Sequence, residues 1–222
     1  WIGATVPLLK IYKQKHYVER QPGAIRNSFR RLGVTLKNVK NEKKIFLFLL
    51  AFFFFIDGVY TIIDMATAYG TALGFDSTKL LLALLVTQIV AFPFAIIFGK
   101  LANCYKTERL IMICIGAYFG IAVFAIFLRE QWQFWILAVL VGMFQGGIQA
   151  LSRSYFAKII PPEKSGEYFG LMDICGKGAS FLGTTVISLI SQVTGHINIG
   201  VGSISLFFVI GMIMFRMAAA EK

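Results

Sequence analysis

Long apolar stretches with few or no charged residues, separated by short charged connections, dominate the chain from residue 45 onward. Six of them are long enough to cross a membrane, because an α-helix rises about 1.5 Å per residue and the hydrocarbon core is about 30 Å thick. Lipid offers no water to unpaired backbone groups, so each stretch is predicted to be helical. The fold class expected is therefore an all-α membrane protein with six transmembrane helices, over residues 45–72, 80–99, 110–128, 131–152, 168–192 and 197–215.

The composition supports lipid rather than water as the main solvent. Of the 222 residues, 57% are hydrophobic and 15% charged, with a mean hydropathy of +0.72. A soluble chain has about 25% charged residues. Residues 10–44 hold eleven Lys or Arg and two Glu, which is +9 of the total net charge of +11. Because the basic excess is confined to this block, a nucleic-acid-binding surface on the folded protein is not favoured. The rest of the chain is nearly neutral.

The positions of Lys and Arg predict the orientation, because cytoplasmic loops retain positive charge. If the amino end is inside, nineteen of the 22 Lys and Arg residues lie in inner segments. The outer loops hold only Lys79 and Arg129, and Lys177 lies within a helix. We expect both ends to be cytoplasmic and the location to be a bacterial plasma membrane.

The first 44 residues divide into two expected segments. Residues 1–9 are apolar but would span only about 14 Å as a helix, so they are interpreted as the stump of a preceding transmembrane helix. Residues 10–44 form a basic linker in which apolar residues recur at helical spacing. This pattern favours an amphipathic helix on an anionic leaflet, or alternatively a plain solvated linker, since Gly33 interrupts it. The apolar positions of the linker are Ile25, Phe29, Leu32, Leu36 and Val39. The six-helix domain is expected over 45–216 and a cytoplasmic tail over 217–222.

Polar residues are unevenly distributed among the six predicted spans. Polar groups within a membrane face a bundle interior or a watery cavity. The first, second, fourth and fifth spans are therefore expected to line a path, whereas the third and sixth face lipid. The polar residues of the four path-lining spans are Asp57, Tyr60, Asp64, Tyr69, Gln88, Gln145, Gln149, Asp173, Lys177 and Ser180.

Two sequence motifs resemble a known family. The connection after the second span is similar to the loop signature of the major facilitator superfamily, G-x-L-A-D-x-x-G-x-[KR]-[KR]. More specifically, the strings around residues 145–154, 167–170 and 176–177 resemble the vacuole-effluxer-like branch, as does 57–59. The signature is matched at Gly99, Leu101, Ala102 and Arg109, with Asn103 in place of Asp and Lys106 in place of Gly.

The resemblance implies the carboxyl-terminal half of a secondary transporter, built as a 3+3 inverted repeat and working by alternating access. It implies an amino-terminal six-helix half as the partner, with a homodimer of halves as an alternative. A small polar solute is the implied cargo, and the association of fungal relatives with vacuolar amino-acid release suggests an amino acid. Coupling to protons is expected through the first span.

Asp57 lies close to the centre of the first span, where an ionisable group is by default a functional candidate. It could carry a proton, contact a substrate amine, or simply be hydrogen-bonded to a neighbouring helix. Asp64 lies about 10 Å nearer the outer surface and is expected to be more hydrated.

Three further sets of residues leave alternatives open. Asp173 and Lys177 are spaced to pair along one helix face, either as a neutralised pair or as a switch. Gln145 and Gln149 could contact the cavity or bond to other helices, while the neighbouring glycines indicate close packing. Arg153 at the inner end of the fourth span could bind Glu167 or lipid phosphate, as a cytoplasmic gate or a topology charge.

Catalytic functions are not expected. His16 and His196 are predicted on opposite sides of the membrane, which excludes a His-centred base or a metal site within the chain. The three cysteines fall in the cytoplasmic loop or in spans, so no disulfide framework is predicted. No cofactor is expected. The alternatives to transport are a membrane scaffold or sensor and, less favoured, an intramembrane enzyme.

Overall fold

The computed structural model describes residues 5–6, 33, 39 and 42–221, and these are helical apart from short connections. The predicted helix stump (1–9) and the predicted amphipathic surface helix fall almost entirely outside the described residues. Val39, which is described, is buried in the core. The elements are α3 (Lys43–Ala72), α4 (Ser77–Cys104), α5 (Thr107–Ile126), α6 (Gln131–Ile159), the 3₁₀ helix η1 (Pro162–Lys164), α7 (Ser165–Thr194), α8 (Ile197–Ser203) and α9 (Ser205–Ala220).

The expected fold class is confirmed. Within the described part of the chain, six helical segments are long and apolar enough to cross a membrane, and no strand occurs. Each predicted span corresponds to one of them. The helices extend beyond the apolar stretches, however, because α6 continues past Ser152 to Ile159 and α4 continues to Cys104. A polar residue outside the hydrocarbon layer does not break a helix, so the apolar pattern underestimates helix length.

The last predicted span is divided at Ile204 into α8 and α9. The Oγ of Ser203 donates a hydrogen bond to the carbonyl of Gly200 at 2.6 Å. A serine that bonds back to the preceding turn competes with the helical pattern and often bends a helix. The Cα of Gly202 also packs so closely on Ile126 of α5 that an added Cβ would lie 2.5 Å from that side chain. The uniform apolar pattern does not reveal this break.

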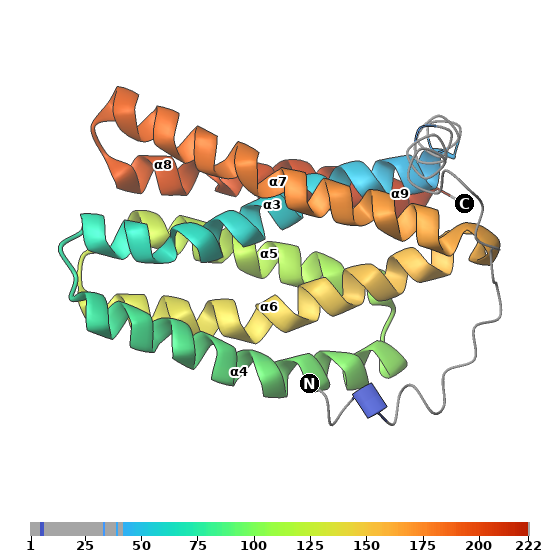
Figure 1. Ribbon diagram of the computed structural model, residues 1–222, viewed down its shortest axis with the longest axis horizontal. Helices are drawn as coiled ribbons and strands as arrows, with labels where there is room; N and C mark the ends of the chain where they lie inside the picture. The colour runs from blue at the N-terminus through green and yellow to red at the C-terminus, as the bar shows by residue number, and fades with distance from the viewer. Residues whose placement is uncertain (1–4, 7–32, 34–38, 40–41, 222) are drawn as a thin grey trace.

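The six segments lie side by side, and their connections gather at two ends of the bundle (Figure 1). The α3–α4, α5–α6 and α7–α8 connections share one end, and the α4–α5 and α6–α7 connections share the other with the carboxyl terminus. Most of the described cationic residues lie at this second end, while the side of the membrane that it faces stays a prediction. They are Lys43, Lys44, Lys100, Lys106, Arg109, Lys158, Lys164 and Arg216.

The helix packing is symmetric when the first three spans are exchanged with the last three. Between the two sets, α4 packs on α6 and α3 packs on α7; likewise α3 packs on α9 and α5 packs on α6. Exchanging α3 with α6, α4 with α7 and α5 with α9 converts the α4–α6 contact into the α7–α3 contact. The same exchange converts the α3–α9 contact into the α6–α5 contact. This is the pattern expected of an inverted three-helix repeat.

Glycines permit the closest approaches between helices. A Cβ on Gly142 of α6 would lie 2.6 Å from the backbone oxygen of Thr87 on α4, and one on Gly211 of α9 would lie 2.9 Å from the Cβ of Phe55 on α3. The prediction that the glycines of α6 serve packing is confirmed. Thr87 also donates from Oγ1 to the carbonyl of Ala138 at 3.2 Å, which links α4 and α6 directly.

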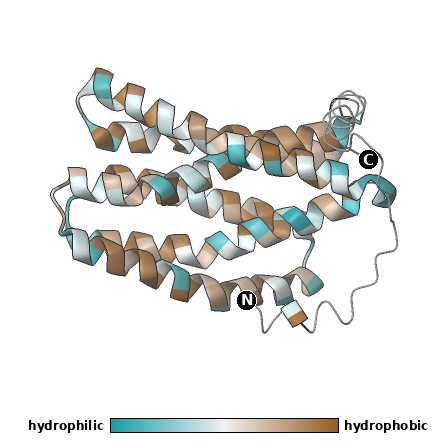
Figure 2. Cartoon of the chain, viewed as in Figure 1, coloured by the Kyte–Doolittle hydropathy of each residue, from teal (hydrophilic) through white to brown (hydrophobic). Residues whose placement is uncertain are grey.

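Aromatic rings fill the core between α3, α6 and α9. Phe48 on α3 stacks on Phe156 of α6, with 5.4 Å between ring centroids, and meets Phe215 of α9 edge to face. These three side chains are fully buried. Figure 2 shows apolar residues along all the helices, with hydrophilic positions at both ends and along the middle of α6 and α7. The polar positions at mid-length are the ones that require a functional or structural explanation.

Candidate functional site

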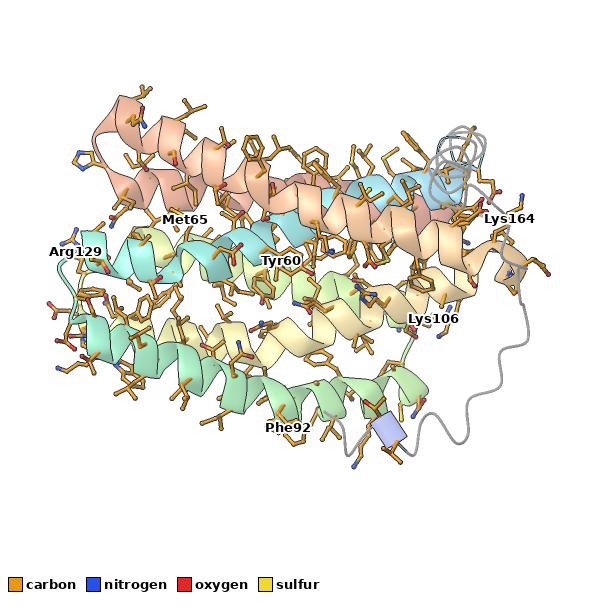
Figure 3. All side chains as sticks on the ribbon, viewed as in Figure 1. Tyr60, Met65, Phe92, Lys106, Arg129 and Lys164 are labelled. Carbon is orange, nitrogen blue, oxygen red and sulfur yellow. The ribbon has the colours of Figure 1, made fainter. Side chains whose placement is uncertain are left out.

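A pocket with a volume of about 90 Å³ lies between α3, α6 and α7. It draws on three of the four spans that were expected to line a path, and α4 does not contribute. Figure 3 shows that Tyr60, one of its lining residues, lies near the middle of the length of the bundle. Both polar and apolar side chains line it: Phe52, Ile56 and Tyr60 from α3, Gln149 and Arg153 from α6, and Met172, Asp173, Gly176 and Lys177 from α7.

An ion pair crosses this pocket from α6 to α7. The Nη2 of Arg153 donates to the Oδ1 of Asp173 at 2.7 Å. In the described part of the chain, the backbones of α6 and α7 rarely come close, since α7 packs mainly on α3 and α6 mainly on α4. Phe156 of α6 meets Phe169 of α7 edge to face, with 5.5 Å between ring centroids. The ion pair is therefore a polar link between two helices that also meet through these rings. Both side chains are about half exposed (56% and 48%), so water screens the attraction and its contribution to stability is small.

The pairing differs from both sequence expectations for these charges. Asp173 was expected to pair with Lys177 one turn further along α7, and Arg153 was expected to bind Glu167 or lipid phosphate. Arg153 instead takes Asp173, which lies six residues after Glu167 and so about 9 Å nearer the middle of α7. The spacing i,i+4 shows that two residues of one helix can meet, but a partner on another helix was geometrically better placed.

Lys177 also lines the pocket, and its side chain is exposed. Among the described residues, it makes no hydrogen bond or salt bridge. It is the twelfth residue after the start of α7 at Ser165, which is about 18 Å along the helix axis. The pocket thus places the ammonium group of Lys177, well inside the length of α7, beside the ion pair of Arg153 and Asp173.

Asp57 lies about one turn before Tyr60 on α3 but is fully buried and does not line the pocket. Its Oδ1 accepts a hydrogen bond from the backbone N–H of Gly183 on α7 at 3.1 Å and another from the hydroxyl of Thr61 at 3.3 Å. Its Oδ2 is buried without a hydrogen-bond partner among the described residues. The carboxyl group therefore joins α3 to α7, and one of its oxygens remains available to a proton or a donor.

A glycine is needed at position 183 for this contact. A Cβ there would lie 2.0 Å from the Oγ1 of Thr61 and 3.0 Å from the Oδ1 of Asp57. Thr61 is itself fully buried. The α7 backbone can approach the carboxylate closely only because no side chain stands between them.

The remaining candidates of the predicted path do not meet at the pocket. The Oε1 of Gln145 is buried without a partner among the described residues, whereas Gln149 lines the pocket one turn away. Gln88 on α4 and Asp64 on α3 are exposed and line neither of the two described cavities. Tyr60, Gln149, Asp173 and Lys177 therefore line one pocket, and the shared wet face expected for all the candidates stays a prediction.

The loop signature forms the end of α4 and the start of α5. Gly99, Leu101, Ala102 and Asn103 belong to the last turns of α4, and only Tyr105 and Lys106 separate the helices. Asn103 and Arg109 are exposed. Lys158 of α6 donates from Nζ to the Oγ1 of Thr107 at 3.3 Å, which ties this connection to the neighbouring helix. The signature thus shapes a tight turn at one end of the bundle, away from the pocket.

A second, smaller cavity of about 20 Å³ lies on the other side of Asp57, toward the end that carries the α3–α4 connection. Thr61 and Tyr69 line it from α3, and the Tyr69 hydroxyl donates to the carbonyl of Ala125 on α5. Its other lining residues are apolar. A space of this size holds about one water molecule.

Sequence reasoning missed the two groups that hold Asp57. Thr61 stands four residues after Asp57, a spacing that brings side chains together on a helix, so it could have been found. Gly183 lies 126 residues away and acts through its backbone, so no local signal identifies it. Within the described residues no group of three or more His, Cys, Asp or Glu side chains is arranged to hold a metal ion.

Comparison with known proteins identifies the family. The family described as "Vacuole effluxer Atg22 like" matches residues 1–222. The chain is 46% identical over its full length to the MFS-type transporter YxiO of Bacillus subtilis, of which it covers 52%. It is 26% identical over 219 residues to autophagy-related protein 22-2 of Aspergillus niger, covering 88% of this chain and 35% of the relative. It is 29% identical over 176 residues to autophagy-related protein 22 of Saccharomyces cerevisiae, covering 74% and 33%.

The chain thus spans about half the length of the Bacillus relative and about a third of the fungal ones. The family is described as an effluxer and the Bacillus relative as a transporter, rather than as an enzyme, in line with the sequence expectation. Six apolar helices and a family match over every residue lead to one conclusion. The chain is a multi-pass membrane protein that belongs to the vacuole effluxer Atg22-like family of major-facilitator-type proteins.

Proposed function

We propose that this chain forms one half of a secondary active transporter that moves a small polar solute by alternating access. The observation that carries the proposal is the pocket between α3, α6 and α7, which places charged side chains at mid-length in an apolar bundle. Ionisable groups at such depth are costly and usually mark a solute or ion path. The second wall of the path would come from an amino-terminal six-helix half or from a second copy of this chain.

An amino acid fits the chemistry of this pocket. It contains side chains of both signs, Arg153 and Lys177 on one hand and Asp173 on the other, together with the neutral polar groups of Tyr60 and Gln149. The carboxylate group of such a solute finds a complementary charge in Lys177, and its ammonium group would compete with Arg153 for Asp173. The apolar lining from Phe52, Ile56 and Met172 suits the carbon skeleton of such a solute.

Asp57 is the proposed proton carrier. Its carboxyl group is fully buried, has one oxygen without a partner, and binds the backbone of the helix that carries Asp173 and Lys177. A change in its protonation alters the strength of the hydrogen bond that it accepts from Gly183, since a carboxylate is a stronger acceptor than the neutral acid. Protonation is thereby linked to the position of α7 relative to α3.

The location proposed is a bacterial plasma membrane, with both ends of the chain in the cytoplasm. The strong concentration of Lys and Arg at one end of the bundle supports this orientation, because cytoplasmic loops retain positive charge. The Bacillus relative supports a bacterial setting.

The test uses the intact protein in liposomes that enclose a pH-sensitive dye. Each of the twenty L-amino acids is added singly, and both solute-driven proton movement and exchange of radiolabelled solute are recorded. We expect at least one amino acid to move protons. In Asp57→Asn the proton movement should be lost while solute exchange continues, because the Asn Oδ1 still accepts from Gly183 and Thr61.

The control is Glu163→Gln, an exposed carboxylate in η1 outside the pocket, which should behave as the wild type. Normal proton coupling in Asp57→Asn would remove Asp57 as the carrier. Absence of any solute movement in the wild type would contradict transport and favour the membrane-scaffold alternative.

A further inference from the structure

We infer that Lys177 is an anion-binding group of the pocket and that it holds the acidic oxygen group, carboxylate or phosphate, of the bound solute. The inference rests on the proposed function only in that the pocket lies on the solute path. It makes Lys177 the residue that selects solutes carrying an acidic group, whereas Arg153 and Asp173 satisfy each other's charge.

The charges of the pocket support this assignment. Arg153 and Asp173 are in contact at 2.7 Å and neutralise each other. Tyr60 and Gln149 are neutral, and the other lining side chains are apolar. Among the described residues, Lys177 has neither a hydrogen bond nor a salt bridge. The pocket with its ion pair therefore has one uncompensated positive charge, which attracts an anion and repels a simple amine.

The depth of Lys177 requires a partner for this charge. The residue lies about 18 Å along α7 from its start at Ser165 and about 25 Å from its end at Thr194. A lysine near a helix end can extend its ammonium group to the membrane surface. From the middle of a 30-residue helix the side chain is too short to do so. Intramembrane cations pair with an acidic group or face water in a cavity, and Asp173 on the same helix is already used.

The surroundings of Lys177 suit a small acidic group. The pocket volume of about 90 Å³ is several times the roughly 10–15 Å³ that one water needs on the same measure, so it can hold a carboxylate or phosphate group. The hydroxyl of Tyr60 and the side-chain amide of Gln149, which line the same pocket, are hydrogen-bond donors for the remaining oxygens. A lysine ammonium binds such oxygens as a compact point charge.

The competing explanation is that Lys177 pairs with an acidic side chain of the other six-helix half. In that case the charge would be satisfied inside the protein, and added anions would not bind. The two explanations also differ in what happens on neutralising the lysine. Loss of an internal ion pair destabilises the intact protein, whereas loss of a ligand group leaves the empty protein as stable as before.

The experiment measures binding of small probes to the intact detergent-solubilised protein by thermal shift. The probes are propionate, inorganic phosphate, propionamide and propylammonium, each titrated at constant ionic strength set with sodium chloride. We expect saturable stabilisation by propionate, by phosphate or by both, and none by the amide or the amine. The two anions show whether the favoured group is a carboxylate or a phosphate.

In Lys177→Gln, the affinity for the effective anion should fall by about tenfold or more, since hydrogen bonds to charged groups contribute about 1.5–3 kcal/mol. Lys177→Arg should keep the affinity within a few fold. The matched control is Lys164→Gln, which removes an exposed charge of η1 at the end of the bundle, well away from Tyr60 (Figure 3), and should bind as the wild type does.

Equal binding of propionamide or propylammonium would overturn the inference, and so would unchanged anion affinity in Lys177→Gln. Failure of every anion to bind, together with a lower melting temperature of the unliganded Lys177→Gln protein, would assign Lys177 to an internal ion pair instead. Because binding is measured without transport, anion binding through Lys177 in a protein that moves no solute would support this inference while contradicting the proposed function.

Discussion

Replacing Gly183 with alanine tests the close contact between α3 and α7 that holds Asp57. The new Cβ would lie 2.0 Å from the Oγ1 of Thr61 and 2.9 Å from its Cβ. The side chain of Thr61 is fully buried on α3 and borders a cavity of only about 20 Å³. The helices must therefore separate, or the hydrogen bond from Thr61 to Asp57 must break.

The expected destabilisation follows from three contributions. Overpacking of a filled interior costs about 1–3 kcal/mol. Loss of the hydrogen bond from Thr61 costs about a further 0.5–1.5 kcal/mol, since the Oδ1 of Asp57 keeps Gly183 as a donor. Alanine has a higher helix propensity than glycine, which offsets about 1 kcal/mol. The net loss of folding free energy is about 0.5–3.5 kcal/mol, so the melting temperature should fall by up to several degrees.

The assay is thermal unfolding of the purified protein in detergent, with Gly178→Ala as the matched control. Gly178 lies on the same helix, and no atom is within 4 Å of where its Cβ would be, so its substitution should be neutral or stabilising. A Gly183→Ala protein as stable as Gly178→Ala would refute the reasoning, because both changes have the same propensity term and differ only in the contact. Solute-driven proton movement should also fall in Gly183→Ala, since Asp57 loses its position against α7.

Two further predictions concern the packing of α4 and the ion pair of the pocket. Gly142→Ala should lower the melting temperature, because its Cβ meets a backbone oxygen of Thr87 at 2.6 Å and the cost lies at the upper end of the overpacking range of about 1–3 kcal/mol. Gly120→Ala, with no neighbour within 4 Å, should leave the melting temperature unchanged. Equal melting temperatures of the two variants would contradict the α4–α6 contact. Asp173→Asn frees Arg153 from its ion pair and should raise the affinity for propionate several-fold in the thermal-shift titration, and a weaker affinity would count against a pocket with an excess of positive charge.

The number and type of helices could be predicted from the chain alone. A helix that crosses about 30 Å of hydrocarbon must satisfy all its backbone groups internally and expose apolar side chains, so each span is a long stretch with few or no charged residues. This constraint acts on each segment separately, so the number and type of the spans follow from the sequence. The helix ends were less predictable, as the continuation of α6 to Ile159 shows, because charged residues are tolerated in a helix that extends beyond the membrane. The break at Ile204 depends on a serine side chain and on packing against α5.

The candidate site was predictable in its chemistry but only partly in its arrangement. The polar residues at mid-span were visible because they interrupt an apolar background. Their grouping was not, because spacing within one helix gives no information about the neighbouring helix. The pairing of Asp173 with Arg153, in place of Lys177, is one result. The burial of Asp57 against the backbone of α7 is another.

The amino-acid sequence by itself determined that this protein is a bundle of six apolar helices with one strongly basic end and a few ionisable groups at mid-depth. These properties depend on composition along each segment and on the thickness of the membrane. The tertiary structure decided which ionisable groups meet, which are sealed and which remain without a partner. Those outcomes depend on where a residue such as Gly183 allows two helices to approach, and that distance is set by residues more than a hundred positions apart in the chain.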